Sequence, residues 1–358
     1  MQAEALAALT LHFTPGLGPV RIKALVERAG GAAAALALPP AVAREAASLD
    51  AATAAGLGAA APRERAALEA ERAARLGLTL LPYCDDRYPE ALRAIYDPPP
   101  ILWVRGGVEP LAGLRGPTPR SFGIVGTRRC SAHARAFTSR LAGDLARAGV
   151  LVVSGLARGV DTEAHRAAVQ SGGASVAVLG CGADRVYPPE NAELAASLTL
   201  VSAYPVGTPP EAHNFPARNR IIAGLVSGVA VVEGDLKSGS MITATAALEA
   251  GRTVFAVPGR PGEANTAGPH RLLREGAVLC ESAEDVLAEL GWDGPPARPD
   301  LCLEGDQAVV YGALEGALLL DDVVAATALD PSRALAALML LSLGGAVREL
   351  PGGRYSRS

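Results

Sequence analysis

The chain has few cysteines and no long apolar run. Its five cysteines are widely scattered, with no C-x-x-C pair and no histidine at the spacing of a zinc site. We therefore expect neither disulfide bridges nor structural zinc. No run of 18 apolar residues occurs, and the N-terminus lacks the basic-then-apolar pattern of a secretory signal. These absences predict a cytoplasmic protein that does not enter a membrane.

Lysine is almost missing. Only two of the 33 lysine and arginine residues are lysines, Lys23 and Lys237, in a chain of 358 residues with a net charge of −4. Together with the abundant alanine, this bias indicates genome composition rather than arginine selected for binding phosphate. Local clusters of arginine are therefore informative, whereas the total number is not.

The usual signatures of nucleotide cofactors and hydrolytic enzymes are also absent. The first strand candidate of the central region opens into Gly126-Thr127-Arg128-Arg129, not into G-x-G-x-x-G, and residues 150–154 offer no acid to bind a ribose. The sequence shows no P-loop lysine, Ser-His-Asp spacing or paired-carboxylate pattern. We expect no dinucleotide or other cofactor, no metal and no catalytic residues, hence no enzyme.

The N-terminal third contains two regions. Residues 1–75 are alanine-rich and helical in pattern, and residues 14–25 place a Pro-Gly-x-Gly turn between apolar helical segments. This fits a helix–hairpin–helix whose glycines expose backbone N–H groups to a DNA phosphate, although an ordinary helix–helix connection fits equally well. Residues 76–119 read as a strand, a loop and a strand ending near Arg105, which lead into the next domain.

Residues 120–292 alternate between apolar runs and helical patterns. The strand candidates are residues 122–126, 150–155, 175–180, 198–203, 228–234, 253–259 and 277–280. The helix candidates are residues 131–148, 161–171, 190–197, 217–227, 240–251 and 282–290. Continuous apolar strands separated by helices predict an α/β fold, a Rossmann-like, doubly wound and mostly parallel sheet. Ligands of such folds bind beyond the carboxyl ends of the strands.

The C-terminal part reads as a separate unit. A proline-rich linker at 293–304 precedes residues 305–358, which follow the pattern helix, turn, helix and glycine-rich hairpin of a winged helix. This unit has few basic residues, namely Arg333, Arg348, Arg354 and Arg357. Binding of double-stranded DNA and contact with a protein therefore both remain open.

The segment HNFPARNRII, residues 213–222, gathers groups that suit nucleic acid. It contains no acid and carries +2 when histidine is counted as neutral. Phe215 can stack on a base, Arg218 and Arg220 can hold phosphate, and the two asparagines can bond a base edge. A loop that ends at Pro216, ahead of the helix 217–227, could hold the same residues for structural reasons.

Two other strand ends point toward an anion site. Ser131 is expected to cap the helix after the first strand, and the N–H groups at that helix start favour an anion. Arg128 lies directly in the turn, whereas Arg129, Arg135 and Arg140 fit a solvated helix face. Gly239 and Ser240 precede another helix, whose N-terminus forms a second expected anion site.

The loops after the second and sixth strands are less specific. Arg158 in SGLARG can reach the same edge, and Asp161 is expected to cap the next helix. An Asp161–His165 pair one turn apart could support acid–base chemistry, but it fits better as a support for the helix start. Residues 257–277 read as a structural loop. Together these strand ends offer arginines, glycines and helix starts but no nucleophile with its base, which indicates that they hold a polyanion.

Six segments resemble the DprA/Smf family of DNA-processing proteins of bacterial transformation. They are GIVGTRR (123–129), SGLARGVDTEAH (154–165), AVLGCGADRVYPPEN (177–191), FPARNRIIAGL (215–225), SGSMITATAALEAGR (238–252) and VFAVPG (254–259). The resemblance implies a protein that binds and protects single-stranded DNA, loads RecA onto it and forms homodimers through the Rossmann-like domain. The predicted DNA-binding residues are Gly126, Thr127, Arg128, Arg158, Asn214, Phe215, Arg218, Asn219, Arg220, Gly239 and Ser240.

A nucleotide phosphoribohydrolase on a related Rossmann-like fold is the alternative. Those enzymes carry a PGGxGTxxE pattern, whereas the corresponding stretch here, KSGSMITATAALE, lacks the paired glycines and the short spacing to glutamate. Two positions depart from the DprA/Smf pattern: Thr127 stands where serine is common, and His270 stands where asparagine is usual. The second departure leaves the role of its loop in doubt.

Overall fold

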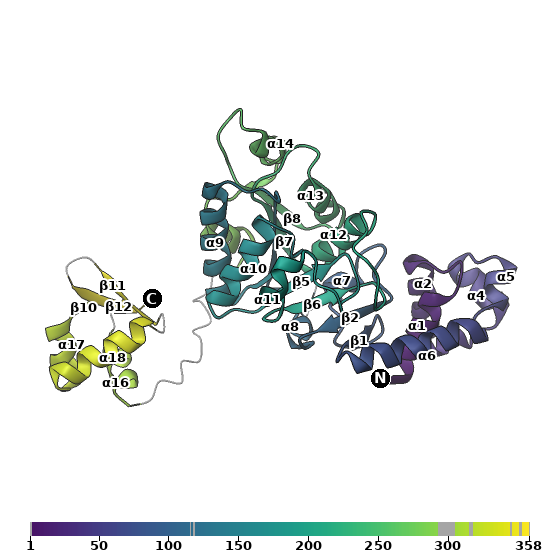
Figure 1. Ribbon diagram of the computed structural model, residues 1–358, viewed down its shortest axis with the longest axis horizontal. Coiled ribbons are helices and arrows are strands. Elements are labelled where there is room, and N and C mark those ends of the chain that lie inside the picture. The colour runs from purple at the N-terminus through teal and green to yellow at the C-terminus, as the bar shows by residue number, and fades with distance from the viewer. Residues whose placement is uncertain are drawn as a thin grey trace. The chain divides into compact units, whose positions relative to one another are not determined.

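The computed structural model describes residues 2–114, 116, 119–292, 305–314, 318–343, 346–350 and 353–357. The chain divides into two compact units, residues 1–297 and 298–358 (Figure 1). The expected linker at 293–304 lies outside the described residues.

The larger unit is built on one mixed sheet. Among the described residues, nine strands pair in the order β1-β2-β6-β5-β4-β3-β7-β8-β9. The strands are β1 (Thr79–Pro82), β2 (Ile101–Arg105), β3 (Ser121–Val125), β4 (Leu151–Ser154), β5 (Ser175–Leu179), β6 (Thr199–Ser202), β7 (Gly228–Val231), β8 (Thr253–Ala256) and β9 (Val278–Leu279). All pairs from β6 to β9 are parallel, which confirms the Rossmann-like prediction. The lead-in region adds β1 and β2 to this sheet as antiparallel strands.

Helices cover both faces of the sheet. Those in this region are α7 (Glu90–Arg93), α8 (Glu109–Ala112), α9 (Ala132–Arg147), α10 (Val160–Gln170), α11 (Ala192–Ala195), α12 (Asn214–Leu225), α13 (Gly239–Glu249), α14 (Ala267–Arg274) and α15 (Ala283–Glu289). Single 3₁₀ turns lie at Pro189–Asn191 and Ala264–Thr266. The predicted loop at 257–277 was wrong in part, because it contains α14.

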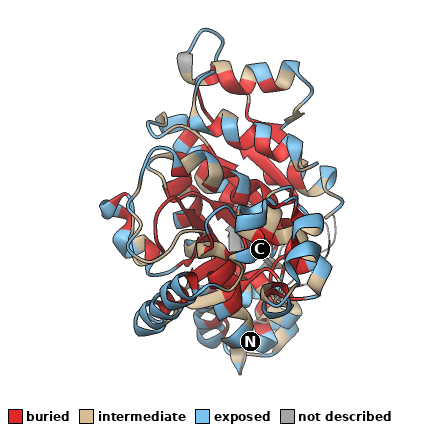
Figure 2. Ribbon diagram, turned by 90° about the vertical axis from the view of Figure 1, so that its right-hand side faces the viewer, coloured by how far each residue is buried: buried red, intermediate tan, exposed pale blue. Residues whose placement is uncertain are grey.

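Side chains of one strand alternate between the two helical layers. Phe122 and Ile124 of β3 pack in one core with α9, α10 and α15, whereas Val125 packs in another with α13 and α14. Figure 2 shows the central strands as buried. Burial on both faces explains why these strands are continuously apolar in sequence.

The N-terminal helices pack onto the same unit. They are α1 (Gln2–Phe13), α2 (Pro19–Ala29), α3 (Ala32–Leu36), α4 (Pro40–Ala47), α5 (Ala51–Ala55) and α6 (Ala60–Arg75). The turn between α1 and α2 contains Gly16 at φ +82°, and its carbonyl accepts a hydrogen bond of 2.8 Å from Arg21 Nη1. The predicted helical region is confirmed, while DNA contact by this turn stays a prediction.

Glu69 of α6 ties the helical region to the sheet. Its buried carboxylate accepts hydrogen bonds from Trp103 Nε1 at 2.9 Å and from the Val206 amide at 2.7 Å. One side chain therefore joins α6, β2 and the segment after β6. Both donors depend on the same oxygen, Oε1.

Glu69→Ala should lower the free energy of unfolding by about 1–3 kcal/mol, because two buried donors lose their acceptor. Urea unfolding of the full chain measures this effect. Glu71→Ala, on the exposed face of the same helix, is the matched control and should change the value by less than about 0.5 kcal/mol. Equal values for both variants would contradict the assignment.

The second unit has the expected winged-helix elements. They are α16 (Asp306–Ala313), β10 (Leu318–Leu319), α17 (Leu320–Thr327), α18 (Pro331–Leu343), β11 (Val347–Leu350) and β12 (Arg354–Arg357). Their core includes Val310, Val323, Leu338 and Leu341. The described strands pair in the order β10-β12-β11.

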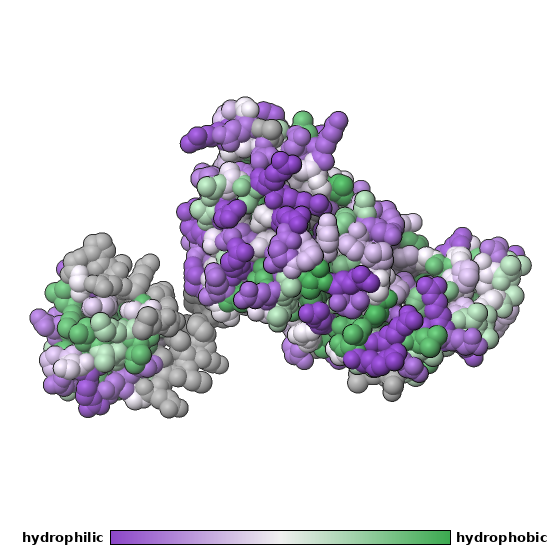
Figure 3. All heavy atoms as spheres, viewed as in Figure 1, coloured by the Kyte–Doolittle hydropathy of each residue, from purple (hydrophilic) through white to green (hydrophobic). Residues whose placement is uncertain are grey.

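Hydrophobic side chains also lie on the surface of this unit (Figure 3). Met339 and Leu340 of α18 are 59% and 53% exposed, and Arg333 forms an ion pair with Asp306 at 2.6 Å. In the described parts of the chain, no single helix is long and apolar enough to cross a membrane. Among the described residues, one pair of helices, α17 and Pro331–Ser342, reaches together the length and apolar composition of a membrane span, but the pair is bent by 111°.

Candidate nucleic-acid interface

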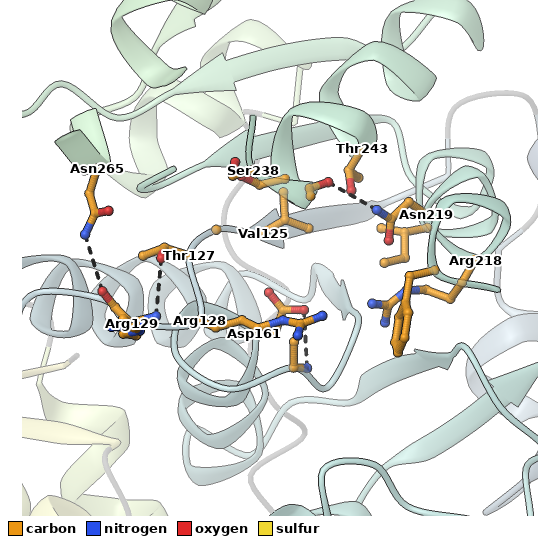
Figure 4. Close-up of a pocket in the computed structure, with 16 residues that line it drawn as sticks. Val125, Thr127, Arg128, Arg129, Asp161, Arg218, Asn219, Ser238, Thr243 and Asn265 are labelled. Carbon is orange, nitrogen blue, oxygen red and sulfur yellow. Dashed lines mark hydrogen bonds between the residues drawn. The ribbon is translucent and has the colours of Figure 1, made fainter. Parts of the chain in front are cut away.

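A pocket of about 540 Å³ lies beyond the carboxyl ends of β3, β4 and β7 (Figure 4). Eight of the predicted DNA-binding residues line it: Gly126, Thr127, Arg128, Phe215, Arg218, Asn219, Gly239 and Ser240. Val125, Arg129, Ala157, Asp161, Ile222, Ser238, Thr243 and Asn265 complete the described lining. The strand-end loops therefore converge as the sequence predicts.

Helix α12 brings one face of the HNFPARNRII segment to this pocket. The helix begins at Asn214, so the expected loop up to Pro216 was wrong. Proline fits the first helical turn because its missing N–H would have no intrahelical partner there. Phe215, Arg218, Asn219 and Ile222 follow the spacing i, i+3, i+4, i+7, and all four line the pocket.

Two guanidinium groups lie near the ring of Phe215. The Cζ atoms of Arg128 and Arg218 are 5.6 Å and 5.5 Å from the centre of its ring, which fits cation–π contact. A Cβ atom at Gly180 would lie 3.0 Å from the ring, so a larger residue would displace it. Arg128 is exposed and has no ion pair among the described residues. Its charge is therefore available to a ligand.

Arg218 is different, because it is buried with only 5% of its surface exposed. Its Nη1 donates to the carbonyl of Val178 at 2.8 Å and to that of Gly155. A Cβ atom at Gly155 would collide with the guanidinium, so this position needs glycine. Burial lowers the pKa of Arg218, although Asp161 opposes the shift. Arg218 thus forms a fixed positive charge in the wall of the pocket.

Asp161 organises the loop after β4. Its Oδ2 accepts hydrogen bonds from the amides of Gly155 at 3.2 Å and Ala157 at 3.4 Å. Burial raises its pKa to about 6, and the charge of Arg218 acts in the opposite direction. The expected helix cap was wrong, because α10 begins at Val160 and the carboxylate bonds the preceding loop.

His165 does not pair with Asp161, so that expected contact was also wrong. Its Nδ1 lies 2.7 Å from the hydroxyl of Ser175, which donates to the carbonyl of Val152 at 2.8 Å. The Ser175 hydroxyl uses its proton on Val152, so Nδ1–H of the histidine is the donor to Ser175. Complete burial lowers the pKa of His165 to about 3. The imidazole is therefore neutral and structural.

This burial makes stability depend on pH. Between pH 6.5 and about 3 the unfolded chain binds a proton on His165 that the folded chain does not, so the free energy of unfolding falls as pH falls. His165→Gln should remove this contribution, which amounts to at most about 1.4 kcal/mol per pH unit.

Urea unfolding of the wild type and the variant from pH 7.5 to 4.5 tests this prediction. The exposed His133→Gln is the control and should keep the wild-type slope. The half-buried His12, whose pKa burial lowers to about 4, is common to all three proteins and cancels in the comparison. Parallel curves for wild type and His165→Gln would contradict the assignment.

The N-terminus of α9 is already occupied. Ser131 caps it as predicted, because its Oγ accepts a hydrogen bond of 3.0 Å from the Ala134 amide. The carboxylate of Glu233 also lies there and accepts from the Ser131 amide at 3.0 Å and hydroxyl at 2.6 Å. The prediction of a free anion site at this helix was therefore wrong. Glu233 additionally shapes the arginine turn, since its carbonyl accepts from the Thr127 amide at 2.7 Å.

The N-terminus of α13 is open to the pocket. Ser238 precedes the helix without a side-chain capping bond and lies 2.6 Å, Oγ to Oγ, from Ser240. The amides of Gly239 and Ser240 find no acceptor within the described chain. Asn219 Nδ2 donates to the Gly239 carbonyl at 3.2 Å and holds α12 against this helix start. Free N–H groups and the helix dipole make this end an anion site.

Asn265 is a pocket residue that the sequence analysis missed. It lies in the 3₁₀ turn before α14, and its Nδ2 donates to the carbonyl of Arg129 at 3.4 Å. Its own carbonyl accepts from the Gly234 amide at 2.6 Å. Only the return of this loop to the β3 turn brings it to the pocket, which no local pattern indicates. Thr243, whose hydroxyl the sequence offers one helical turn after Gly239, also lines the pocket.

Three predicted residues do not line the pocket. Arg158 forms an exposed ion pair with Glu190. Asn214 is buried and donates to the carbonyl of Gly180 at 3.0 Å, which gives it a structural role. DNA contact by these two residues stays a prediction.

The third, Arg220, lies 3.4 Å from Asp97 as measured from Nε to Oδ2. Its DNA contact likewise stays a prediction. Among the described residues, no cluster of three or more histidine, cysteine or acidic side chains could hold a metal ion.

Two protein-family models match this chain. Residues 79–291 match the family model of DNA recombination-mediator protein A. The chain belongs to this family. Residues 294–353 match the DprA winged helix domain, in agreement with the fold of the second unit.

Individual relatives extend over most of the chain. Protein Smf of Escherichia coli is 39% identical over 292 residues, 76% of each protein. DNA processing protein DprA of Bacillus subtilis is 42% identical over 218 residues, which cover 60% of this chain and 72% of that protein.

Two solved DprA structures are similar to this fold. That of Streptococcus pneumoniae gives a TM-score of 0.66 at 34% identity and covers 78% of this chain and 95% of its own. That of Helicobacter pylori, whose study concerns its single-stranded DNA binding mode, gives 0.52 at 32% identity and covers 58% and 94%.

Proposed function

We propose that this DprA-family protein binds single-stranded DNA in the pocket at the carboxyl edge of its sheet. The observation that carries the proposal is the union of an unpaired arginine over an aromatic ring, Arg128 over Phe215, with the open start of α13. Such a site can hold a phosphate and stack a base without reading a sequence. The Helicobacter pylori relative, studied for its single-stranded DNA binding, supports the proposal.

The wider role follows from the family resemblance. We propose that the protein protects incoming DNA in the cytoplasm and loads RecA onto it during natural transformation and recombination. We further propose that it acts as a homodimer through the Rossmann-like domain, so that one strand spans two pockets.

An enzymatic role has little support in the pocket. Asp161 is the single acid in the described lining, and its carboxylate bonds loop amides. Glu249 is the last residue of α13, far along the helix from Gly239. This protein therefore lacks, in the described pocket lining, the free carboxylate that a phosphoribohydrolase would need.

Binding of double-stranded DNA by the winged helix is also weakly supported. The exposed face of α18 presents Met339 and Leu340, and Arg333 is paired with Asp306. Duplex binding depends on unpaired cations along the phosphates.

Arg128→Ala should weaken binding of single-stranded oligothymidine about tenfold or more, because a charge-assisted contact to phosphate is lost. The slope of log K against log salt should become shallower by about 0.7, the value for one phosphate contact. Fluorescence anisotropy over a salt series measures both quantities.

Arg140→Ala on the exposed face of α9 is the control and should behave as wild type. RecA filament assembly on oligonucleotides covered by a single-strand-binding protein provides the second readout, and only Arg128→Ala should slow it. Unchanged affinity and salt slope for Arg128→Ala would exclude the pocket as the DNA site.

Ser238→Asp tests the α13 anion site in a way that separates binding from folding. Aspartate is a favoured N-cap, so the free energy of unfolding should stay equal or rise by up to about 1 kcal/mol. Its carboxylate would occupy the place of a phosphate, so affinity for single-stranded DNA should fall.

Ser238→Asn, a neutral cap of similar size, is the control and should bind as wild type. Paired urea unfolding and anisotropy measure the two effects. Equal affinity for both variants would show that the start of α13 does not hold phosphate.

A further inference from the structure

The segment after β5 places a second aromatic ring beside the pocket. Tyr187 is 38% exposed, and its ring centre is 6.2 Å from that of Phe215 with an angle of 48° between the planes. The Tyr187 hydroxyl has no hydrogen-bond partner in the described part of the chain. Burial and hydrogen bonding therefore do not account for tyrosine at this position.

A cation lies close to the segment that carries this ring. Arg158, in the loop after β4, is paired with Glu190, which is three residues after Tyr187. Both members of this ion pair are about half exposed, at 54% and 50% of their side chains. Exposed pairs of this kind contribute little free energy, so a phosphate can replace the carboxylate at small cost.

Tyr187 and Arg158 adjoin the groups that line the pocket. Phe215 lines the pocket with Arg128 over its ring, and its ring also neighbours that of Tyr187. Each group neighbours the next: Arg128 and the α13 start line one pocket, Arg128 lies over Phe215, and Phe215 neighbours Tyr187. Tyr187 is three residues before Glu190, the ion-pair partner of Arg158. This series includes both anion-binding and stacking groups, as a strand of nucleotides requires.

We infer that Tyr187 and Arg158 form a second nucleotide subsite, which takes the nucleotide adjacent to the one held in the pocket. The base stacks on the exposed tyrosine ring, and its phosphate replaces Glu190 on the guanidinium. This inference rests on the proposed single-stranded DNA binding. It gives the exposed Arg158 and the DRVYPPEN segment (184–191) a role that the pocket alone does not.

Tyr187→Ala should reduce the affinity for oligothymidine by roughly 5- to 150-fold, the range for loss of one base stack. On an oligonucleotide of the same length that lacks every base, Tyr187→Ala should not reduce the affinity, because no base is present to stack on the ring. Tyr187→Trp should keep the wild-type affinity. Tyr96→Ala, which removes another tyrosine that is 80% exposed, is the matched control and should change neither affinity.

The exchange at Arg158 has its own test. Glu190→Gln should raise the affinity for oligothymidine severalfold, because it frees the guanidinium of Arg158. When Arg158→Ala is also present, Glu190→Gln should give no gain in affinity. Glu193→Gln removes a nearby exposed acid that has no ion pair with a described residue, and it controls for the change in net charge. A gain for Glu190→Gln that survives Arg158→Ala would overturn the exchange.

The outcomes separate this inference from the proposed function. If Arg128→Ala weakens binding but Tyr187→Ala does not, the pocket binds DNA and the second subsite is wrong. An equal loss for Tyr187→Ala on normal and base-free strands would make the tyrosine a structural support and overturn the inference. If the wild type fails to bind any oligothymidine, the proposed function itself fails.

Discussion

The buried guanidinium of Arg218 is the constraint on which the pocket depends. A buried cation is stable only where acceptors and a counter-charge surround it. Here the carbonyls of Gly155 and Val178 accept its protons, and Asp161 supplies the opposing charge. The two bonds from Nη1 thereby join α12 to the loop after β4 and to β5, while Nε has no hydrogen-bond partner among the described residues.

The same arrangement separates two uses of arginine. Arg218 is buried and hydrogen-bonded to the backbone beside Phe215, whereas Arg128 lies exposed over that ring. The aromatic side chain is thus supported from within and remains available at the surface. The two helix starts differ in a similar way. The carboxylate of Glu233 occupies the N-terminus of α9, whereas the N-terminus of α13 has no side-chain capping bond.

Much of this architecture could be predicted from local sequence. Apolar strands with both faces buried indicated the parallel sheet, and eight pocket residues were foreseen from strand ends and motifs. Two of the failures share a cause. The occupied start of α9 and the place of Asn265 each depend on a residue remote in sequence, Glu233 for the first and Arg129 for the second. No spacing rule reveals such a partner.

The sequence by itself determined the α/β fold class, the order of the elements along the chain and the edge of the sheet at which the pocket lies. These properties follow from hydrophobic periodicity and from the rule that parallel strands end at a common edge. Tertiary structure alone decided which charges remain free. Arg128 and Arg218 look alike in sequence, but only packing shows that Arg218 is buried and hydrogen-bonded to backbone carbonyls, whereas Arg128 is exposed in the pocket.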